Sequence, residues 1–253
     1  MKLEQLLSAE RVSDARRAVL RALERLGLWR DGEWRLEDRP RMPWPATGLK
    51  LARDIGHRHP EVAALIEEPG LIAVVERLLG GGPFDRKIYP RPQILASLPN
   101  TEPWVLPNGW HTDVPRLASG ARAGLQLFTF LEPVEPRGGG TLVIAGSHHL
   151  LNDNRNLKVK DINSALRSEL FFRELFQPHE PRGEPECLPV GHVGRTPLRV
   201  VELTGRPGDV WLMDLRVLHA AAPNTSDRPR LMATYRFVRA ALIPEIAAAF
   251  GWS

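Results

Sequence analysis

The sequence has very little cysteine, with Cys187 alone among 253 residues. A single cysteine cannot form an intramolecular disulfide, and a structural zinc site built from several thiolates is excluded. Any metal that this chain holds must therefore be bound by imidazole and carboxylate groups.

Long apolar runs are also lacking. No stretch approaches the roughly 18 consecutive apolar residues that a membrane-spanning helix needs. The first residues, MKLEQ, do not begin the apolar segment of a secretory signal. We therefore expect a cytoplasmic protein without a membrane partner.

The charges form no block of one sign. The formal net charge is +4, but the 34 lysines and arginines are scattered among 30 acidic residues, whereas a nucleic-acid surface gathers its positive charge. We expect no nucleic-acid partner. Arg155, Lys158 and Lys160 could form a basic rim that attracts an anionic ligand, or could be ordinary solvated side chains.

Apolar residues make up 43% of the chain, enough for the core of one sizeable domain. We expect a single domain over residues 1–253. Helical spacing predicts helices in the front third, over 9–26, 48–57, 60–67 and 71–79. The first of these has Ser8 or Ser13 as its N-cap and Gly27 as its stop.

After residue 83 the pattern changes to short alternating segments, such as 93–98 and 125–131, separated by turn residues. This pattern is typical of a double-sheet jelly roll. We therefore expect a mainly β fold with flanking helices: a mainly helical N-terminal support over 1–82, and a double-stranded β-helix, or cupin-like jelly-roll, core over 83–253. A helical pattern over 161–176 predicts a lid-like insertion at about 150–200.

The residues that suggest chemistry are two histidines and an aspartate. His111 and Asp113 follow a turn-forming Pro-Asn-Gly, and in a strand residues i and i+2 share one face. His219 follows a short apolar strand and is the candidate third ligand. Two imidazoles and one carboxylate hold Fe(II) on one face and leave the opposite positions open. Arg230, eleven residues after His219, starts another strand-like run, where its guanidinium could bind a carboxylate.

These residues belong to a longer pattern, which includes GGGTLVIAGSH at 138–148, RPGD at 206–209 and HAAAPNTS from 219. From about residue 110 to 237 this pattern resembles the phytanoyl-CoA dioxygenase family of Fe(II)- and 2-oxoglutarate-dependent oxygenases. One departure is Ala145, where the family usually has proline before the glycine. The resemblance implies that His111, Asp113 and His219 bind Fe(II) and that Arg230 binds the distal carboxylate of 2-oxoglutarate.

The resemblance also implies the reaction. With O2, the co-substrate 2-oxoglutarate is converted to succinate and CO2 while an unactivated C–H bond of a small-molecule substrate is hydroxylated. Asp113 favours hydroxylation over halogenation, because a related halogenase has a non-coordinating residue at that position. Desaturation, epoxidation and ring closure stay open, as do the identity of the substrate and the oligomeric state.

Three more residues are candidates for binding 2-oxoglutarate. Gln93 and Gln126 lie in strands that line the co-substrate pocket of the resembling family, although either could be a satisfied core amide. Ser226 could hydrogen-bond the co-substrate or cap a turn. Two other functions remain possible: a jelly-roll protein that binds metal or ligand without turnover, and a zinc hydrolase using the same ligands.

Overall fold

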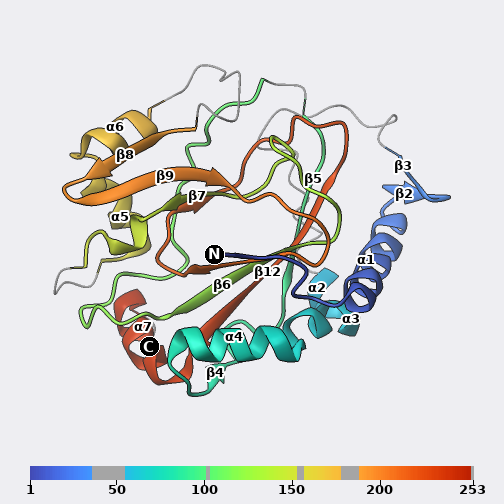
Figure 1. The fold of residues 1–253 in the computed structure, drawn as a ribbon, viewed down its shortest axis with the longest axis horizontal. Helices are drawn as coiled ribbons and strands as arrows, with labels where there is room; N and C mark the ends of the chain where they lie inside the picture. The colour runs from blue at the N-terminus through green and yellow to red at the C-terminus, as the bar shows by residue number, and fades with distance from the viewer. Residues whose placement is uncertain (36–54, 101–102, 153–156, 178–187, 252–253) are drawn as a thin grey trace.

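The computed structural model describes residues 1–35, 55–100, 103–152, 157–177 and 188–251. Two antiparallel sheets lie over one another, with helices on their outer faces (Figure 1). The large sheet has the order β1-β10-β6-β12-β4, and β5 also pairs with β12. Its strands are β1 (Lys2–Leu3), β4 (Phe84–Asp85), β5 (Gln93–Ser97), β6 (Gly124–Phe130), β10 (Val210–Asp214) and β12 (Arg230–Arg239).

The small sheet has the order β11-β7-β9-β8. Its strands are β7 (Leu142–Ala145), β8 (Val190–Val193), β9 (Thr196–Glu202) and β11 (His219–Ala220). A separate two-stranded hairpin is formed by β2 (Trp29–Arg30) and β3 (Glu33–Trp34). This arrangement, mainly β with flanking helices, is consistent with the jelly roll expected from the sequence.

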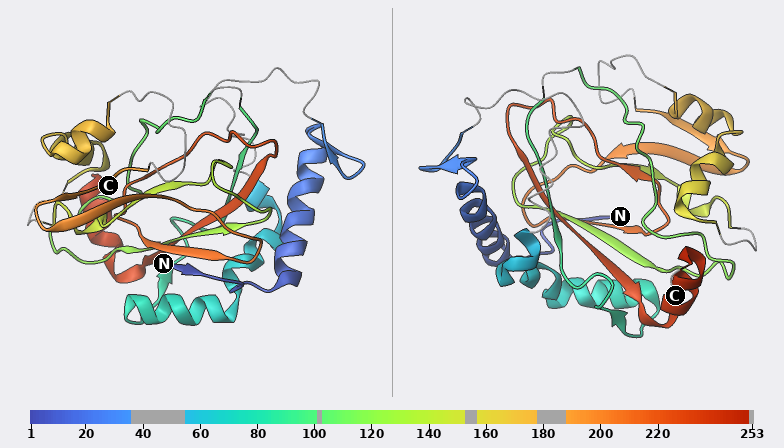
Figure 2. Two further views of the ribbon diagram at one scale, coloured as in Figure 1. Left: turned by 45° about the horizontal axis from the view of Figure 1, so that its top comes forward. Right: turned by 180° about the vertical axis from the view of Figure 1, so that it is seen from behind.

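Helices cover the outer face of each sheet (Figure 2). The large sheet is covered by α1 (Ala9–Glu24), α2 (Ile55–Arg58), α3 (Pro60–Ala63), the 3-10 helix η2 (Ala64–Glu67) and α4 (Pro69–Leu79). Against the small sheet pack α5 (Val159–Leu166) and α6 (Leu170–Leu175). The remaining helical segments are η3 (Ser147–His149), η5 (Ala240–Leu242) and α7 (Ile243–Phe250).

Strand β6 illustrates how the sequence sorts its side chains between two cores. All seven of its residues are buried. Leu125 and Leu127 pack in the cluster beneath the N-terminal helices, whereas Phe128 and Phe130 belong to the cluster between the sheets. Because successive side chains point to opposite faces, one strand supplies both cores.

Most expected elements are present, with small shifts of boundary. The helix expected over 9–26 is α1, and the Ser8 hydroxyl caps it by accepting a hydrogen bond from the Arg11 N–H at 3.4 Å. The strands expected over 93–98 and 125–131 are β5 and β6. Of the helix expected over 48–57, residues 48–54 lie outside the described part of the chain, and α2 begins at Ile55.

Two expectations differ from the structure. The helix expected over 161–176 is divided into α5 and α6. Glu169, at the N-cap position of α6, has an extended backbone (φ −76°, ψ 133°), so a continuous helix cannot pass through it. Part of the range expected as an insertion, 150–200, also forms β8 and β9 of the small sheet. In the described residues, no helix is long and apolar enough to cross a membrane.

Candidate active site

The two histidines expected to bind metal lie on neighbouring strands. His219 pairs with Val143 of β7 on one side and, on the other, forms an isolated bridge with His111. The His111 N–H donates to the His219 carbonyl at 3.0 Å, and the His219 N–H donates to the His111 carbonyl at 2.9 Å. The imidazole centroids are therefore only 4.4 Å apart, although 108 residues separate them in the chain.

Asp113 completes a cluster of three possible metal ligands. The nearest donor atoms of His111, Asp113 and His219 all lie within 4.8 Å of one another. The Asp113 Oδ2 to His219 Nε2 distance is 3.7 Å. Two ligands at 90° around one ion, each at about 2.1 Å, would be roughly 3 Å apart. A modest contraction would thus give the geometry of a bound divalent ion, and the donor set suits Fe(II).

Backbone carbonyls fix the orientation of both imidazoles. The His111 Nδ1 lies 2.9 Å from the Gly109 carbonyl, and the His219 Nδ1 lies 3.1 Å from the Val217 carbonyl. Since a carbonyl only accepts hydrogen bonds, each Nδ1 carries the hydrogen and each Nε2 keeps its lone pair for a metal. Burial also lowers the pKa of His219 to about 4, against the opposing charge of Asp113, so this imidazole is neutral at neutral pH.

Asp113 is also paired with Arg236, a residue that the sequence reasoning missed. Arg236 donates from Nε to Oδ2 at 2.7 Å and from Nη2 to Oδ1 at 2.9 Å. Burial alone would raise the pKa of Asp113, but its electrostatic interactions with the nearby His219 imidazole and with the charged Arg236, which also donates hydrogen bonds to it, outweigh burial and lower the pKa. The carboxylate is therefore ionised, as metal binding requires.

Arg230 lies on the same inner face of β12, at the start of the strand. It is 6% exposed, and burial lowers its pKa to about 10, so it remains charged at neutral pH. Its Nε donates to the Ser97 hydroxyl at 3.2 Å, and its Nη1 makes a weak contact with the Met232 sulfur at 3.6 Å. Within the described residues these two partners leave most of its five N–H donors for an anionic ligand.

The inner face of β12 connects Arg230 with the metal ligands. Alternate residues 230, 232, 234 and 236 face the space between the sheets. Thr234 is the register partner of Phe128, and the Phe128 ring lies edge-on to the His219 imidazole at 6.3 Å. Arg230 is four residues from Thr234, about 13 Å of strand. Arg230 and the His219 imidazole therefore border the same part of the space between the sheets.

The three remaining candidates have protein partners. Gln93 accepts a hydrogen bond from Arg236 Nη1 at 3.3 Å, so it borders the site through that arginine. Gln126 donates to the Thr234 hydroxyl at 3.3 Å, while its buried Oε1 has no partner in the described residues. Ser226 donates to Asn224 Oδ1 at 2.6 Å in a turn. Contact of any of the three with 2-oxoglutarate stays a prediction.

The expected basic rim is described only in part. Lys158 and Lys160 are exposed at the start of α5, and Arg155 lies outside the described residues. The exposure of these two lysines is typical of ordinary solvated side chains.

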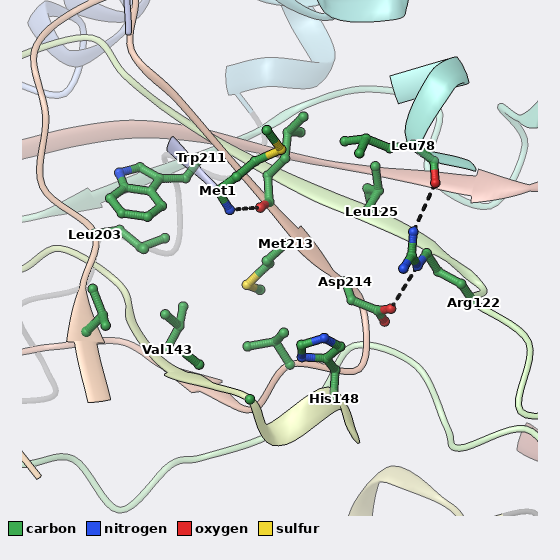
Figure 3. Close-up of a pocket in the computed structure, with 15 residues that line it drawn as sticks. Met1, Leu78, Arg122, Leu125, Val143, His148, Leu203, Trp211, Met213 and Asp214 are labelled. Atoms are coloured by element: carbon green, nitrogen blue, oxygen red, sulfur yellow. Dashed lines mark hydrogen bonds and ion pairs between the residues drawn. The ribbon is translucent and has the colours of Figure 1, made fainter. Parts of the chain in front are cut away.

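A cavity of about 300 Å³ opens between the two sheets (Figure 3). Its lining is mainly apolar, with Val143, Trp211 and Met213 in the interior, and Arg122 and His148 at its polar end. None of the three candidate ligands lines it. The cavity nevertheless borders the strand pair that carries His219, because its lining residue Val143 is the register partner of His219.

Comparison with known proteins yields one family. The model of the phytanoyl-CoA dioxygenase family matches residues 1–232. Among curated proteins, an uncharacterised protein of Mycobacterium tuberculosis is 23% identical, over 94% of this chain and 78% of the relative. A protein of Mycobacterium bovis, also uncharacterised, matches with the same identity and coverage.

Solved structures share the fold at low identity. The 2-oxoglutarate-dependent carbocyclase SnoK from nogalamycin biosynthesis is 20% identical, with a TM-score of 0.58 over 95% of this chain and 79% of that chain. EctD from S. alaskensis, solved with 2-oxoglutarate and 5-hydroxyectoine, is 18% identical, with a TM-score of 0.56 over 95% and 72%. These likenesses confirm the jelly-roll fold. Because the family model spans 232 of 253 residues, the chain belongs to the phytanoyl-CoA dioxygenase family of iron- and 2-oxoglutarate-dependent oxygenases.

Proposed function

We propose that this oxygenase hydroxylates an unactivated C–H bond of a small molecule and that His111, Asp113 and His219 hold its iron. The observation that carries the proposal is the convergence of two imidazoles and one carboxylate within 4.8 Å. Three protein ligands on one face leave room for a chelating co-substrate and for O2.

The two histidines would bind through Nε2, because each Nδ1 is engaged by a backbone carbonyl. Asp113 would bind through Oδ2, the oxygen that lies nearer to His219. When bound, Fe(II) with 2-oxoglutarate and O2 supplies the oxidation: one oxygen atom enters succinate as CO2 is lost, and the other enters the substrate C–H bond.

Arg230 would bind the distal carboxylate of 2-oxoglutarate. It is a buried cation with most of its donors uncommitted among the described residues, and a guanidinium fork matches a carboxylate in two hydrogen bonds. Since its surroundings exclude water, the pairing is stronger than at an exposed arginine. We also propose that Gln93, Gln126 and Ser226 contact the co-substrate.

The substrate class rests on two considerations. Structures of similar fold were solved with nogalamycin RO and with 5-hydroxyectoine, both small molecules. The scattered charges of this chain also offer no block for a nucleic acid. We therefore propose a small-molecule substrate. Because Asp113 can coordinate the metal, we propose hydroxylation rather than halogenation. We also propose that the enzyme is cytoplasmic.

The experiment is an anaerobic titration of the purified protein with Fe(II) and 2-oxoglutarate, followed by visible absorption. Chelation of the iron by the 2-oxo acid gives a charge-transfer band that neither component gives alone. We expect the band in the wild type, its loss in His219→Ala and a weaker band at a given 2-oxoglutarate concentration in Arg230→Ala. Arg16→Ala on α1, which removes a surface pair with Glu132, is the matched control.

Absence of the band from a wild-type protein that demonstrably binds the metal would contradict the proposal. Metal binding without oxygen-dependent formation of succinate would instead favour a binding protein that has lost turnover.

A further inference from the structure

A second arginine on β12 contacts Asp113, one of the three candidate metal ligands, directly. Arg236 lies six residues after Arg230, on the same face of the strand, and its side chain is 14% exposed. It forms two short, parallel hydrogen bonds with Asp113, from Nε to Oδ2 and from Nη2 to Oδ1. This two-point pairing is the strongest geometry available to an arginine and a carboxylate.

The rest of the Arg236 guanidinium is also occupied by protein groups. Nη1 donates to Gln93 Oε1 at 3.3 Å, and the guanidinium carbon lies 4.9 Å from the centre of the Tyr89 ring. A cation at this distance over an aromatic ring is attracted to its face. Arg236 is therefore held on three sides, in contrast to Arg230, and it is built to fix a protein group rather than to receive a ligand.

The two oxygens of Asp113 have different surroundings. Oδ2 lies 3.7 Å from His219 Nε2, so it faces the metal position as well as Arg236 Nε. Oδ1 accepts from Arg236 Nη2. A metal at this position can take a lone pair of Oδ2 while Nη2 keeps Oδ1, because each carboxylate oxygen has two lone pairs.

We propose that Arg236 is a positioning residue that makes Asp113 bind the metal through Oδ2 alone. This inference rests on the proposed function, since it concerns the same three ligands. A carboxylate free to turn could chelate the ion with both oxygens and fill a position that the co-substrate or O2 needs. By holding Oδ1, Arg236 keeps that position open. Gln93 and Tyr89 in turn hold Arg236.

The proposed role depends on the two-point hydrogen bond as well as on the positive charge of Arg236, and one substitution separates these two contributions. Arg236→Lys keeps the positive charge but replaces the planar fork with a single point donor. Electrostatic repulsion between residue 236 and the metal is then unchanged, while the two-point grip on the carboxylate is lost. Partners of metal ligands commonly change metal affinity by about 10- to 100-fold when they are replaced.

The first measurement is Co(II) affinity without co-substrate, by visible absorption titration. We expect Arg236→Lys to bind Co(II) about 10- to 100-fold more weakly than the wild type. The second is the number of exchangeable waters on bound Mn(II), from electron paramagnetic resonance line broadening in 17O-enriched water. We expect one water fewer in Arg236→Lys, because the released carboxylate chelates. Arg16→Lys, the same substitution in the Arg16–Glu132 pair of α1, should match the wild type in both.

Gln93→Leu gives an independent test should Arg236→Lys fail to fold. It removes the acceptor of Arg236 Nη1 and leaves the fork in place, so we expect a smaller loss of Co(II) affinity in the same direction. Wild-type affinity and water count in the tested variant would overturn the positioning role while leaving the proposed function intact. Failure of the wild type itself to bind Co(II) would instead contradict the proposed metal site.

Discussion

Glu202 lies at the end of β9, close enough to Arg230 for the two charges to interact, and its carboxyl is unusually buried. The residue is 9% exposed. Its Oε2 accepts the Arg137 N–H at 2.8 Å, and its Oε1 accepts the Gly140 N–H at 3.0 Å. Burial nevertheless outweighs these hydrogen bonds and the charge of Arg230, and it raises the pKa of Glu202 from 4.5 to about 7.

A raised carboxyl pKa makes the folded protein more stable at low pH. Between the unfolded pKa and the folded pKa, the folded state binds a proton that the unfolded state has released. The contribution is fully present below about pH 4.5 and is lost as the pH rises through about 7. A difference of roughly 2.5 pKa units corresponds to about 3 kcal/mol, most of it lost between pH 5 and pH 8.

The assay is urea unfolding of the wild type and Glu202→Gln at pH 5 and pH 8, without metal or co-substrate. The variant carries no titratable group at this position, and loss of one backbone acceptor gives it an offset that does not depend on pH. We therefore expect the wild type to lose about 2 to 3 kcal/mol relative to the variant between the two pH values. A difference that stays constant from pH 5 to pH 8 would refute the reasoning and indicate that Glu202 is already ionised in the fold.

Three further predictions concern the strands that carry the site. Gly124→Ala should destabilise the fold by about 3 kcal/mol in urea unfolding, because the added Cβ would lie 2.0 Å from the Phe237 carbonyl of the neighbouring strand; near-neutral stability would contradict this. Thr234→Val should lower the free energy of unfolding by about 1 to 3 kcal/mol in the same assay, because it leaves the Gln126 amide N–H without an acceptor and the Leu127 carbonyl without a donor hydroxyl. Gln126→Leu removes a buried amide whose Oε1 is already unpartnered, so we expect stability to be retained and 2-oxoglutarate affinity, measured by anaerobic titration, to fall. Unchanged co-substrate affinity would identify Gln126 as a core residue only.

Local patterns predicted the elements that rely on local signals. α1 has apolar residues at helical spacing, a serine cap and Gly27 with a φ of +68° just beyond its end, and each of these is readable from the sequence. The strand β1 was missed because Lys2 and Leu3 carry no pattern of their own. They are extended because the edge of β10 offers them hydrogen-bond partners, and such a partner is known only from the tertiary fold.

The candidate ligands could be named from the sequence, but their relation to Arg236 could not. Motif and spacing picked out His111, Asp113 and His219, and the structure brings their donor atoms within 4.8 Å. Arg236 lies in the same strand-like run as Arg230, and alternation along that run places both on one face. That signal was available. What the sequence did not contain is that Asp113, 123 residues away, lies within reach of the Arg236 guanidinium.

The two arginines on the inner face of β12 thus have different surroundings. Arg236 has its donors satisfied by Asp113 and Gln93, and its ring contact with Tyr89 leaves it little freedom to move. Arg230 has only a hydroxyl and a thioether as hydrogen-bond partners in the described residues. A buried cation with unsatisfied donors is costly unless a ligand pairs with it. The charge of Glu202 also acts on Arg230, but no carboxylate of the described residues accepts a hydrogen bond from its guanidinium. The proposed binding of 2-oxoglutarate would therefore give Arg230 the hydrogen-bonded anion that Arg236 already has in Asp113.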